Sequence, residues 1–100
     1  MADLIVVYWR DIPAQVIVKK GRQNAKRELP LRFTEAIDMA AMRSGAAATD
    51  DYLAEWRRGA PEPCAPDLEE AVSAAAAKIE ADYDKDRLIA LAKNGGREGA

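Results

Sequence analysis

The sequence predicts an α+β fold in which an N-terminal β-hairpin packs against three to four α-helices. Two short apolar runs near the N-terminus are rich in β-branched residues and have the length of strands. Further along, apolar residues recur every four positions between residues that favour helix ends. A two-stranded ribbon is only marginally stable in water, so the helices must cover it or another strand must extend it. We place that further short strand near Arg27 to Leu31.

The hairpin is delimited by a proline and a glycine. Its first strand is predicted over Leu4 to Trp9, an apolar run that needs cover on both faces. Pro13 lacks a backbone donor and disfavours helix at the preceding residue, so we place a five-residue connection over Arg10 to Ala14. The second strand then runs from Gln15 to Lys20 and ends at Gly21.

Two helices are predicted after the hairpin. The first opens near Pro30, which suits a first helical turn, and closes at Gly45. Its apolar stripe consists of Leu29, Phe33, Ile37 and Ala41. The second begins with Thr49 as N-cap and has Arg57 and Arg58 in its last turn before Gly59. Its buried face is expected to contain Tyr52, Leu53 and Trp56.

The second half of the chain is predicted to be a linker and a long helix. Three prolines between Gly59 and Pro66 indicate an extended linker. Asp67 and Glu70 form a capping box for a helix whose stripe is Leu68, Val72, Ala75, Ile79 and Tyr83. Charged residues from 82 to 87 indicate a break before a last apolar turn. We expect one domain over residues 1–93 and a disordered tail over 94–100.

Composition limits the chemistry that the chain can perform. It contains no histidine and one cysteine, which excludes histidine-ligated zinc and Ser-His-Asp or Cys-His catalysis within the chain. We therefore expect no cofactor, no metal and no catalytic residues. The N-terminus has no basic segment before an apolar one, and no long apolar run follows, so we expect a cytoplasmic protein without membrane contact.

Basic residues are concentrated in one segment, although the whole chain has a net charge of −2. The members of this segment are Lys19, Lys20, Arg22, Lys26, Arg27 and Arg32, opposed only by Glu28. Such a cluster can bind nucleic acid, another polyanion or an acidic protein surface. Nucleic acid is the less favoured of these because no aromatic residue that would stack on bases lies between the charges. The alternative is a solvated strand exit that discourages aggregation.

A second candidate is the predicted hairpin connection. Arg10 and Asp11 lie beside Trp9, and the convergence of polar and aromatic groups on a loop is typical of recognition sites. The alternative is an ordinary turn in which Asp11 binds nearby amides and Trp9 belongs to the core. A weaker hypothesis is a small enzyme that uses Arg10 and Asp11 on a small anionic substrate.

We expect the connection and the basic segment to form one partner-binding surface. Strand geometry places Arg10 and Lys19 about 20 Å apart, at roughly 3.3 Å per residue, which is too far for one small ligand. A protein or an extended anion could cover both, with Trp9 or Ile12 as an apolar anchor and the lysines steering its approach. The expected partner is another protein or a second copy of the chain.

Three strings carry a resemblance to a known family: "YWRDIPAQVIVKKGR", "LPLRFTEAIDMAAMRSG" and "DDYLAEWRR". Over approximately Leu4 to Leu91 the chain resembles the small bacterial domain family labelled "virulence factor". The resemblance implies a domain that occurs alone or at the end of larger conserved virulence factor proteins. Those proteins also carry a NifU-like region and helical repeats. This chain has no paired cysteines, so iron–sulfur scaffolding does not carry over to it.

The resemblance also implies a function. Stand-alone members look like companions of folate-linked and corrinoid-linked methyl-transfer enzymes in proteobacteria, and no catalytic residues carry over onto these positions. We therefore expect a non-catalytic accessory or adaptor domain that acts through a protein partner in one-carbon methyl metabolism.

Overall fold

The computed structural model describes residues 2–45 and 49–97 and confirms the α+β fold. Five strands and four helices are present in this part of the chain. In chain order they are β1 (Ala2–Trp9), β2 (Ile12–Lys20), β3 (Gln23–Glu28), α1 (Leu31–Ser44), α2 (Thr49–Ala54), β4 (Trp56–Arg58), β5 (Glu62–Cys64), α3 (Leu68–Asp82) and α4 (Lys85–Lys93).

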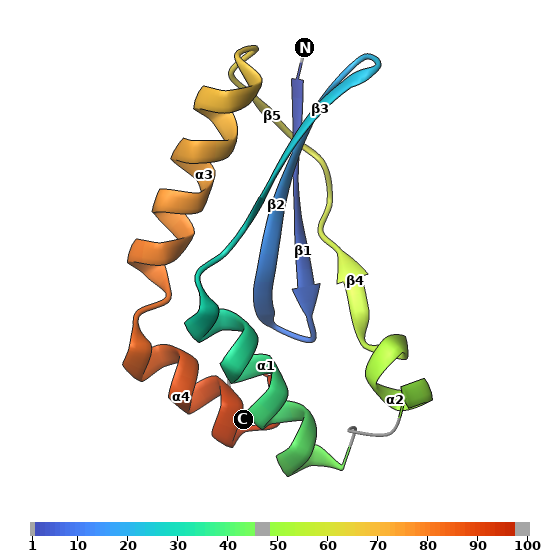
Figure 1. The fold of residues 1–100 in the computed structure, drawn as a ribbon, viewed down its shortest axis with the longest axis vertical. Coiled ribbons are helices and arrows are strands. Elements are labelled where there is room, and N and C mark those ends of the chain that lie inside the picture. Colours follow the sequence, from blue (N-terminus) through green and yellow to red (C-terminus); the bar gives the residue numbers. More distant parts are fainter. Residues whose placement is uncertain (1, 46–48, 98–100) are drawn as a thin grey trace.

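The strands form one antiparallel sheet with β1 near its centre. The strand order is β3-β2-β1-β4, and β5 also pairs with β1 (Figure 1). β4 pairs with Val7–Trp9 of β1, whereas β5 pairs with Ala2–Leu4. β1 therefore has a hydrogen-bonded neighbour at both of its edges, so its backbone groups are paired within the sheet.

The connection between β1 and β2 is shorter than the sequence predicts. Only Arg10 and Asp11 form the turn, because Trp9 pairs directly with Ile12 and Tyr8 pairs with Pro13. The register shifts between Val7 and Tyr8, and this irregularity lets the strand contain a proline. The prediction of a five-residue connection was therefore wrong. The further strand exists as β3, but it lies N-terminal to the predicted position.

The second predicted helix is also shorter than expected. α2 ends at Ala54, and Trp56–Arg58 form β4 rather than a last helical turn. The predicted linker contains β5. Both short strands bind the free edge of β1, and this long-range pairing outweighs the local preference for helix or linker.

Three predicted helix ends are confirmed. Gly45 closes α1 in the left-handed conformation with φ of 76°. The Asp67 side chain caps α3 by accepting a hydrogen bond from the backbone of Glu70 at 3.1 Å. The chain breaks at Tyr83, after which Asp84 caps α4.

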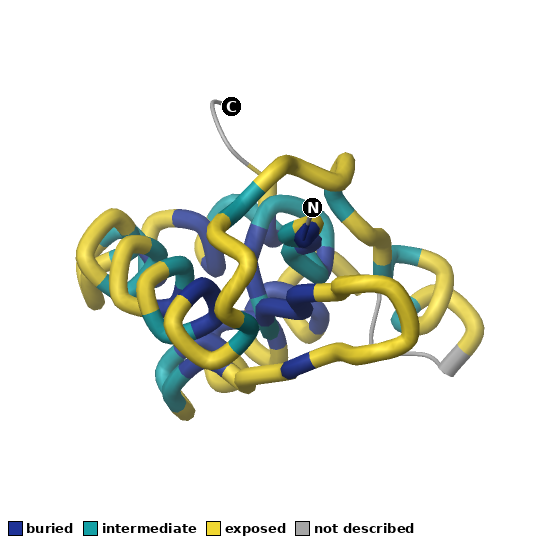
Figure 2. The backbone as a smooth tube through the Cα atoms, turned by 90° about the horizontal axis from the view of Figure 1, so that it is seen from above, coloured by how far each residue is buried: buried dark blue, intermediate teal, exposed yellow. Residues whose placement is uncertain are grey.

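The core lies between the sheet and the helices. α3 packs along β2 and β3 on one face of the sheet, and Figure 2 shows it to one side of the strands. α1 and α4 pack on each other and close the end of the sheet where β1 meets β2 (Figure 1). The largest fully buried side chains include Trp9, Ile12, Val16, Phe33 and Val72.

The segment after α4 returns to the hairpin. The carbonyl of Gly96 accepts a hydrogen bond from the backbone amide of Asp11 at 2.8 Å, and Gly96 itself is buried. Asn94–Arg97 thus form a bonded turn, where the sequence suggested disorder, and residues 98–100 lie outside the described residues. Within the described ranges, no helix combines the length and apolarity needed to cross a membrane.

Candidate functional site

Arg10 lies in the turn between β1 and β2 and is bound within the chain. Its guanidinium donates a hydrogen bond to the carbonyl of Gly95 at 2.8 Å and lies 3.5 Å from a carboxylate oxygen of Glu55. The same group stacks 4.9 Å from the Trp9 ring centroid, and only 13% of the side chain is exposed. Arg10 also has a φ of 54°, which is unfavourable for a residue with a side chain. These contacts fix the turn and leave little of Arg10 for a partner.

Asp11 is held by an arginine that the sequence placed in a helix. Arg57 of β4 donates to an Asp11 carboxylate oxygen at 3.3 Å and to the carbonyl of Arg10 at 3.0 Å. Its guanidinium also stacks 4.5 Å from the Tyr8 ring centroid. The pairing of β4 with β1 brings Arg57 to the turn, so no local sequence signal could have identified it.

Trp9 and Ile12 flank the turn and are fully buried. The indole N–H of Trp9 donates to the carbonyl of Tyr52 at 2.9 Å, and the Tyr52 ring packs between Trp9 and Trp56. Neither Trp9 nor Ile12 reaches the surface in this structure, so a partner could use either as an apolar anchor only if the turn opened. Both belong to the core because the turn is only two residues long. We call residues 9–12 with Glu55, Arg57 and Gly95–Arg97 the locked turn.

A small hollow of about 200 Å³ lies beside Arg10 and is lined by Ser44, Gly45, Asp51, Ala54 and Glu55. The carboxylates of Asp51 and Glu55 would repel an anion that approached Arg10. The hypothesis that Arg10 and Asp11 act on a small anionic substrate therefore loses support from this geometry.

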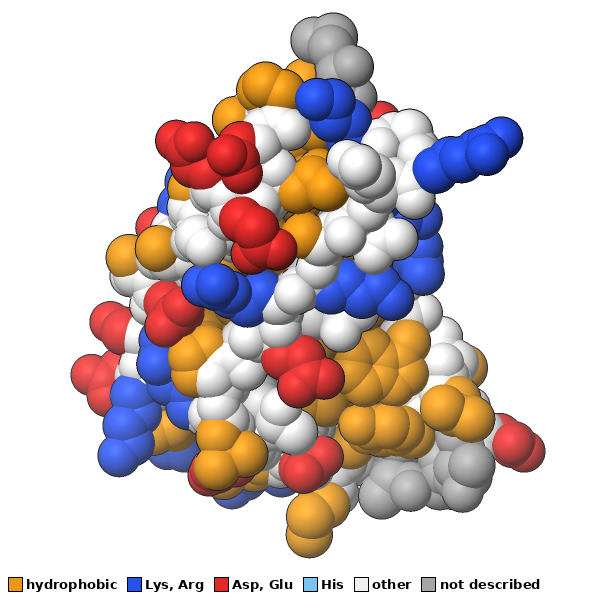
Figure 3. Space-filling view, turned by 45° about the horizontal axis from the view of Figure 1, so that its top comes forward, with side chains coloured by type: hydrophobic (Ala, Val, Ile, Leu, Met, Phe, Trp, Pro, Cys, Tyr) orange, Lys and Arg blue, Asp and Glu red, His pale blue; other side chains and the backbone are white. Residues whose placement is uncertain are grey.

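The opposite end of β2 is exposed and basic. Lys19, Lys20, Arg22, Lys26 and Arg27 are all exposed, and none forms an ion pair with a residue that the structure describes. We call these five residues the basic hairpin. Gly21 supplies the positive φ of 59° that its two-residue turn requires. Figure 3 shows the Lys and Arg side chains gathered at the upper right, where the hairpin extends from the molecule.

Both faces of the basic hairpin carry charge. Val16 pairs with Arg27, and Ile17 pairs with Lys26. Because neighbouring residues of a strand point to opposite faces, Arg27 lies on the face that contacts α3 and Lys26 lies on the other. An anionic group that approaches the hairpin edge meets positive charge from either side.

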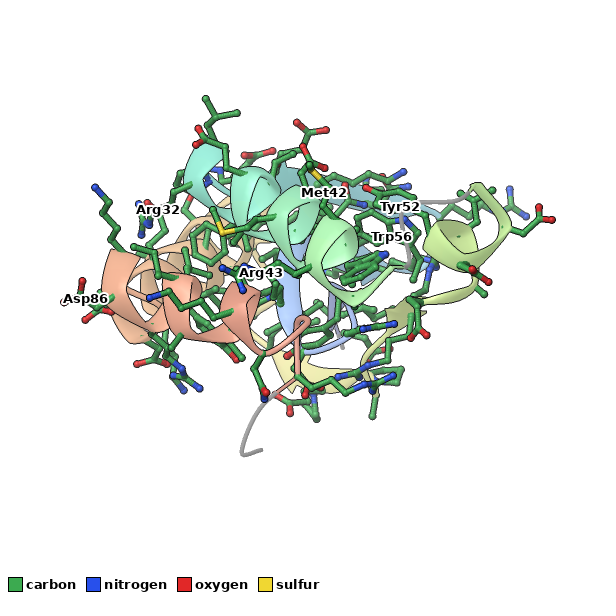
Figure 4. All side chains as sticks on the ribbon, turned by 90° about the horizontal axis from the view of Figure 1, so that it is seen from below. Arg32, Met42, Arg43, Tyr52, Trp56 and Asp86 are labelled. Carbon is green, nitrogen blue, oxygen red and sulfur yellow. The ribbon has the colours of Figure 1, made fainter. Side chains whose placement is uncertain are left out.

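Arg32 is separate from the basic hairpin. It lies on α1, donates to the carbonyl of Glu80 at 3.1 Å and stacks 4.9 Å from the Phe33 ring centroid. Figure 4 shows Arg32 near the start of α1, whereas Tyr52 and Trp56 lie beside the C-terminal end of that helix. The predicted site residues therefore divide into three places: the locked turn, the basic hairpin and the junction of α1 with α3.

Tyr52 is a described residue whose pKa is shifted by its surroundings. Burial raises the pKa of its hydroxyl above the ordinary value of 10.0, and the negative charge of Asp38 on α1 adds to this effect. Tyr52 lies beside Trp9, so this group reports on the packing of the locked turn. Among the described residues, no three His, Cys, Asp or Glu side chains gather closely enough to hold a metal ion.

Comparison with known proteins identifies the family. The sequence profile of the family described as "Virulence factor" matches residues 7–92, which include the basic hairpin and all of the locked turn except Gly95–Arg97. No curated protein and no solved structure matches the chain. Because the family match covers most of the sequence, the chain belongs to the virulence factor family.

Proposed function

We propose that the chain is a non-catalytic adaptor domain whose basic hairpin binds an acidic surface of a protein partner. The observation that carries this proposal is the contrast between the two ends of β2. At the locked turn, Arg10 and Arg57 are bound by carboxylates and carbonyls of the chain itself. At the basic hairpin, five cations within residues 19–27 have no such partner among the described residues.

Electrostatics explains how such a hairpin would act. Five like charges held on β2, β3 and the turn between them repel one another, and an acidic surface relieves this repulsion. The turn of the basic hairpin lies at the top of the molecule, apart from α1, α2 and α4, and its side chains are exposed, so its field is available to a partner before contact (Figure 1). Charges of this kind mainly accelerate association and select against wrong partners.

The family resemblance favours a methyl-transfer or folate enzyme as the partner. Under this proposal, the domain binds an acidic face of such an enzyme and contributes no reacting group. The absence of histidine from the sequence and the internal use of Arg10 are consistent with a binding role.

Affinity capture from the native host tests the proposal. The tagged chain is compared with the variant Lys19→Glu/Lys20→Glu and with the control Lys78→Glu/Lys93→Glu, in which exposed lysines of α3 and α4 are reversed. Both double variants change the net charge equally. We expect wild type and control to recover the same acidic enzyme and the hairpin variant to lose it.

Two outcomes would contradict the proposal. Equal recovery of the enzyme by both double variants would show that binding depends on another surface. Loss of the recovered material after nuclease treatment would show that the basic hairpin binds nucleic acid instead.

A further inference from the structure

We propose that the partner segment bound by the basic hairpin is an extended acidic strand that adds to the outer edge of β3. This inference rests on the proposed function and specifies its binding mode. In this mode, main-chain hydrogen bonds supply much of the affinity and acidic side chains supply the selectivity.

The hydrogen-bond pattern of the hairpin determines which backbone groups are free. In an antiparallel pair, residues alternate between bonding to the partner strand and pointing away from it. The amide of Leu29 donates to the carbonyl of Ala14 at 3.0 Å, which sets the phase of this alternation. Every second residue before Leu29 has the same orientation, so the backbone groups of residues 27, 25 and 23 bond to β2. Asn24, Lys26 and Glu28 therefore direct their N–H and C=O groups outward.

These outward groups have no partner element in the described part of the chain. β3 pairs only with β2 and ends the strand order on its side of the sheet. No backbone hydrogen bond between described residues joins the outer edge of β3 to another segment. The side chains of Asn24, Lys26 and Glu28 are exposed, so an incoming strand would find the edge accessible.

Charge selects the occupant of this edge. A second copy of the chain paired through β3 with its two-fold axis between Lys26 and Arg27 would bring these residues against the same residues of its neighbour, which is unfavourable. An acidic strand would instead place carboxylates opposite Lys26 on one face and Arg27 on the other. Glu28 at the end of β3 would favour a neutral or basic residue opposite it.

Amide hydrogen exchange measured by NMR on the full chain tests the binding mode. The probe is a seven-residue peptide with two adjacent glutamates at its centre, flanked by valine and threonine, so that one carboxylate lies on each face of the added strand. In the free chain, the amides of Ala25 and Arg27 are expected to exchange slowly, while those of Asn24, Lys26 and Glu28 exchange fast. Adding the peptide should slow the exchange of the second group and leave the first unchanged. Because the inward-pointing amides of Ala25 and Arg27 should not respond, they serve as a control within the same strand.

The peptide backbone provides a second measurement that does not alter the protein. Methylating alternate amide nitrogens of the peptide removes the donors on one edge only. We expect one methylated series to lose binding and the complementary series to retain it. Equal binding by both series would overturn strand addition.

A matched pair of protein variants separates strand addition from simple charge attraction. Asn24→Pro removes an outward donor without removing a hydrogen bond of the fold, and Asn24→Ala removes only the side chain. We expect the proline variant to bind the peptide about tenfold more weakly and the alanine variant to bind as wild type. If Lys19→Glu/Lys20→Glu abolishes binding while Asn24→Pro does not, the result supports binding of an acidic partner and contradicts strand addition. If neither substitution matters, the proposed function fails as well.

Discussion

The two ends of β2 contain similar residues but use them differently. At the locked turn, the cations are bound by the chain, the Trp9 ring is buried and the backbone is strained at Arg10. At the basic hairpin, the cations are exposed and one backbone edge is free. The difference teaches that a cluster of arginine and aromatic residues in a sequence does not by itself mark a binding surface. The contacts within the chain make the difference: they tie one end of β2 into the fold, and under our proposal the other end binds a partner.

The largest expected effect is the loss of Trp9 from the locked turn. Trp9→Ala should lower the free energy of unfolding by about 3–5 kcal/mol, because it empties a fully buried site and leaves the carbonyl of Tyr52 without its donor. Chemical denaturation measures this change. A loss below about 1 kcal/mol would mean that the locked turn does not organise the fold.

A smaller effect is expected where the C-terminal turn contacts the indole. Gly96 has a φ of 85°, and a Cβ there would lie 3.0 Å from a ring carbon of Trp9. Gly96→Ala should therefore cost about 1–3 kcal/mol through strain and overpacking. Gly45→Ala is the control, because Gly45 has a similar φ of 76° and nothing within 4 Å of its added Cβ. Equal losses for the two variants would show that the contact with Trp9 contributes nothing.

Alkaline pH should weaken the locked turn through Tyr52. Its pKa is raised in the folded chain by burial and by Asp38, so the folded state holds the proton more tightly than the unfolded state. This contribution is complete below pH 10, the ordinary pKa, and is lost as the pH rises from there through the folded pKa. Unfolding measured from neutral to alkaline pH should show a steeper decline for wild type than for Tyr52→Phe. If the stability of wild type and of Tyr52→Phe declined equally with rising pH, the raised pKa of Tyr52 would not be the cause of the alkaline weakening.

The smallest effect on stability is expected at the basic hairpin. Lys19→Ala/Lys20→Ala should change the free energy of unfolding by less than about 0.5 kcal/mol, because both side chains are exposed and unpaired among the described residues. Thermal and chemical unfolding of the variant check this. A destabilisation comparable with that of Gly96→Ala would mean that these lysines maintain the fold.

The sequence predicts features that depend on local order and periodicity. Helix ends depend on residues within one or two turns, so they can be predicted from the sequence. Examples are the cap at Asp67, the end of α1 at Gly45 and the break near Tyr83. The basic hairpin can also be predicted from the sequence, because its five charged residues are close to one another in the chain.

The remaining features depend on contacts between distant residues. Trp56–Arg58 resembles the end of a helix, and only the free edge of β1 makes it a strand. The internal use of Arg10 depends on Glu55 and Gly95, which are 45 and 85 residues away. No local pattern distinguishes an arginine that such partners will bind from one that remains exposed, so the locked turn was expected to be part of the binding surface.

Association kinetics provide the most direct test of the central claim that recognition resides at the basic hairpin. The rate constant for association with the captured enzyme is measured from low to high ionic strength for wild type and for Lys19→Ala/Lys20→Ala. Removing two steering charges should slow association at low salt and flatten its salt dependence, while the fold remains intact. An unchanged rate and an unchanged salt dependence in the folded variant would contradict the claim and leave the basic hairpin as a solvated end of the sheet.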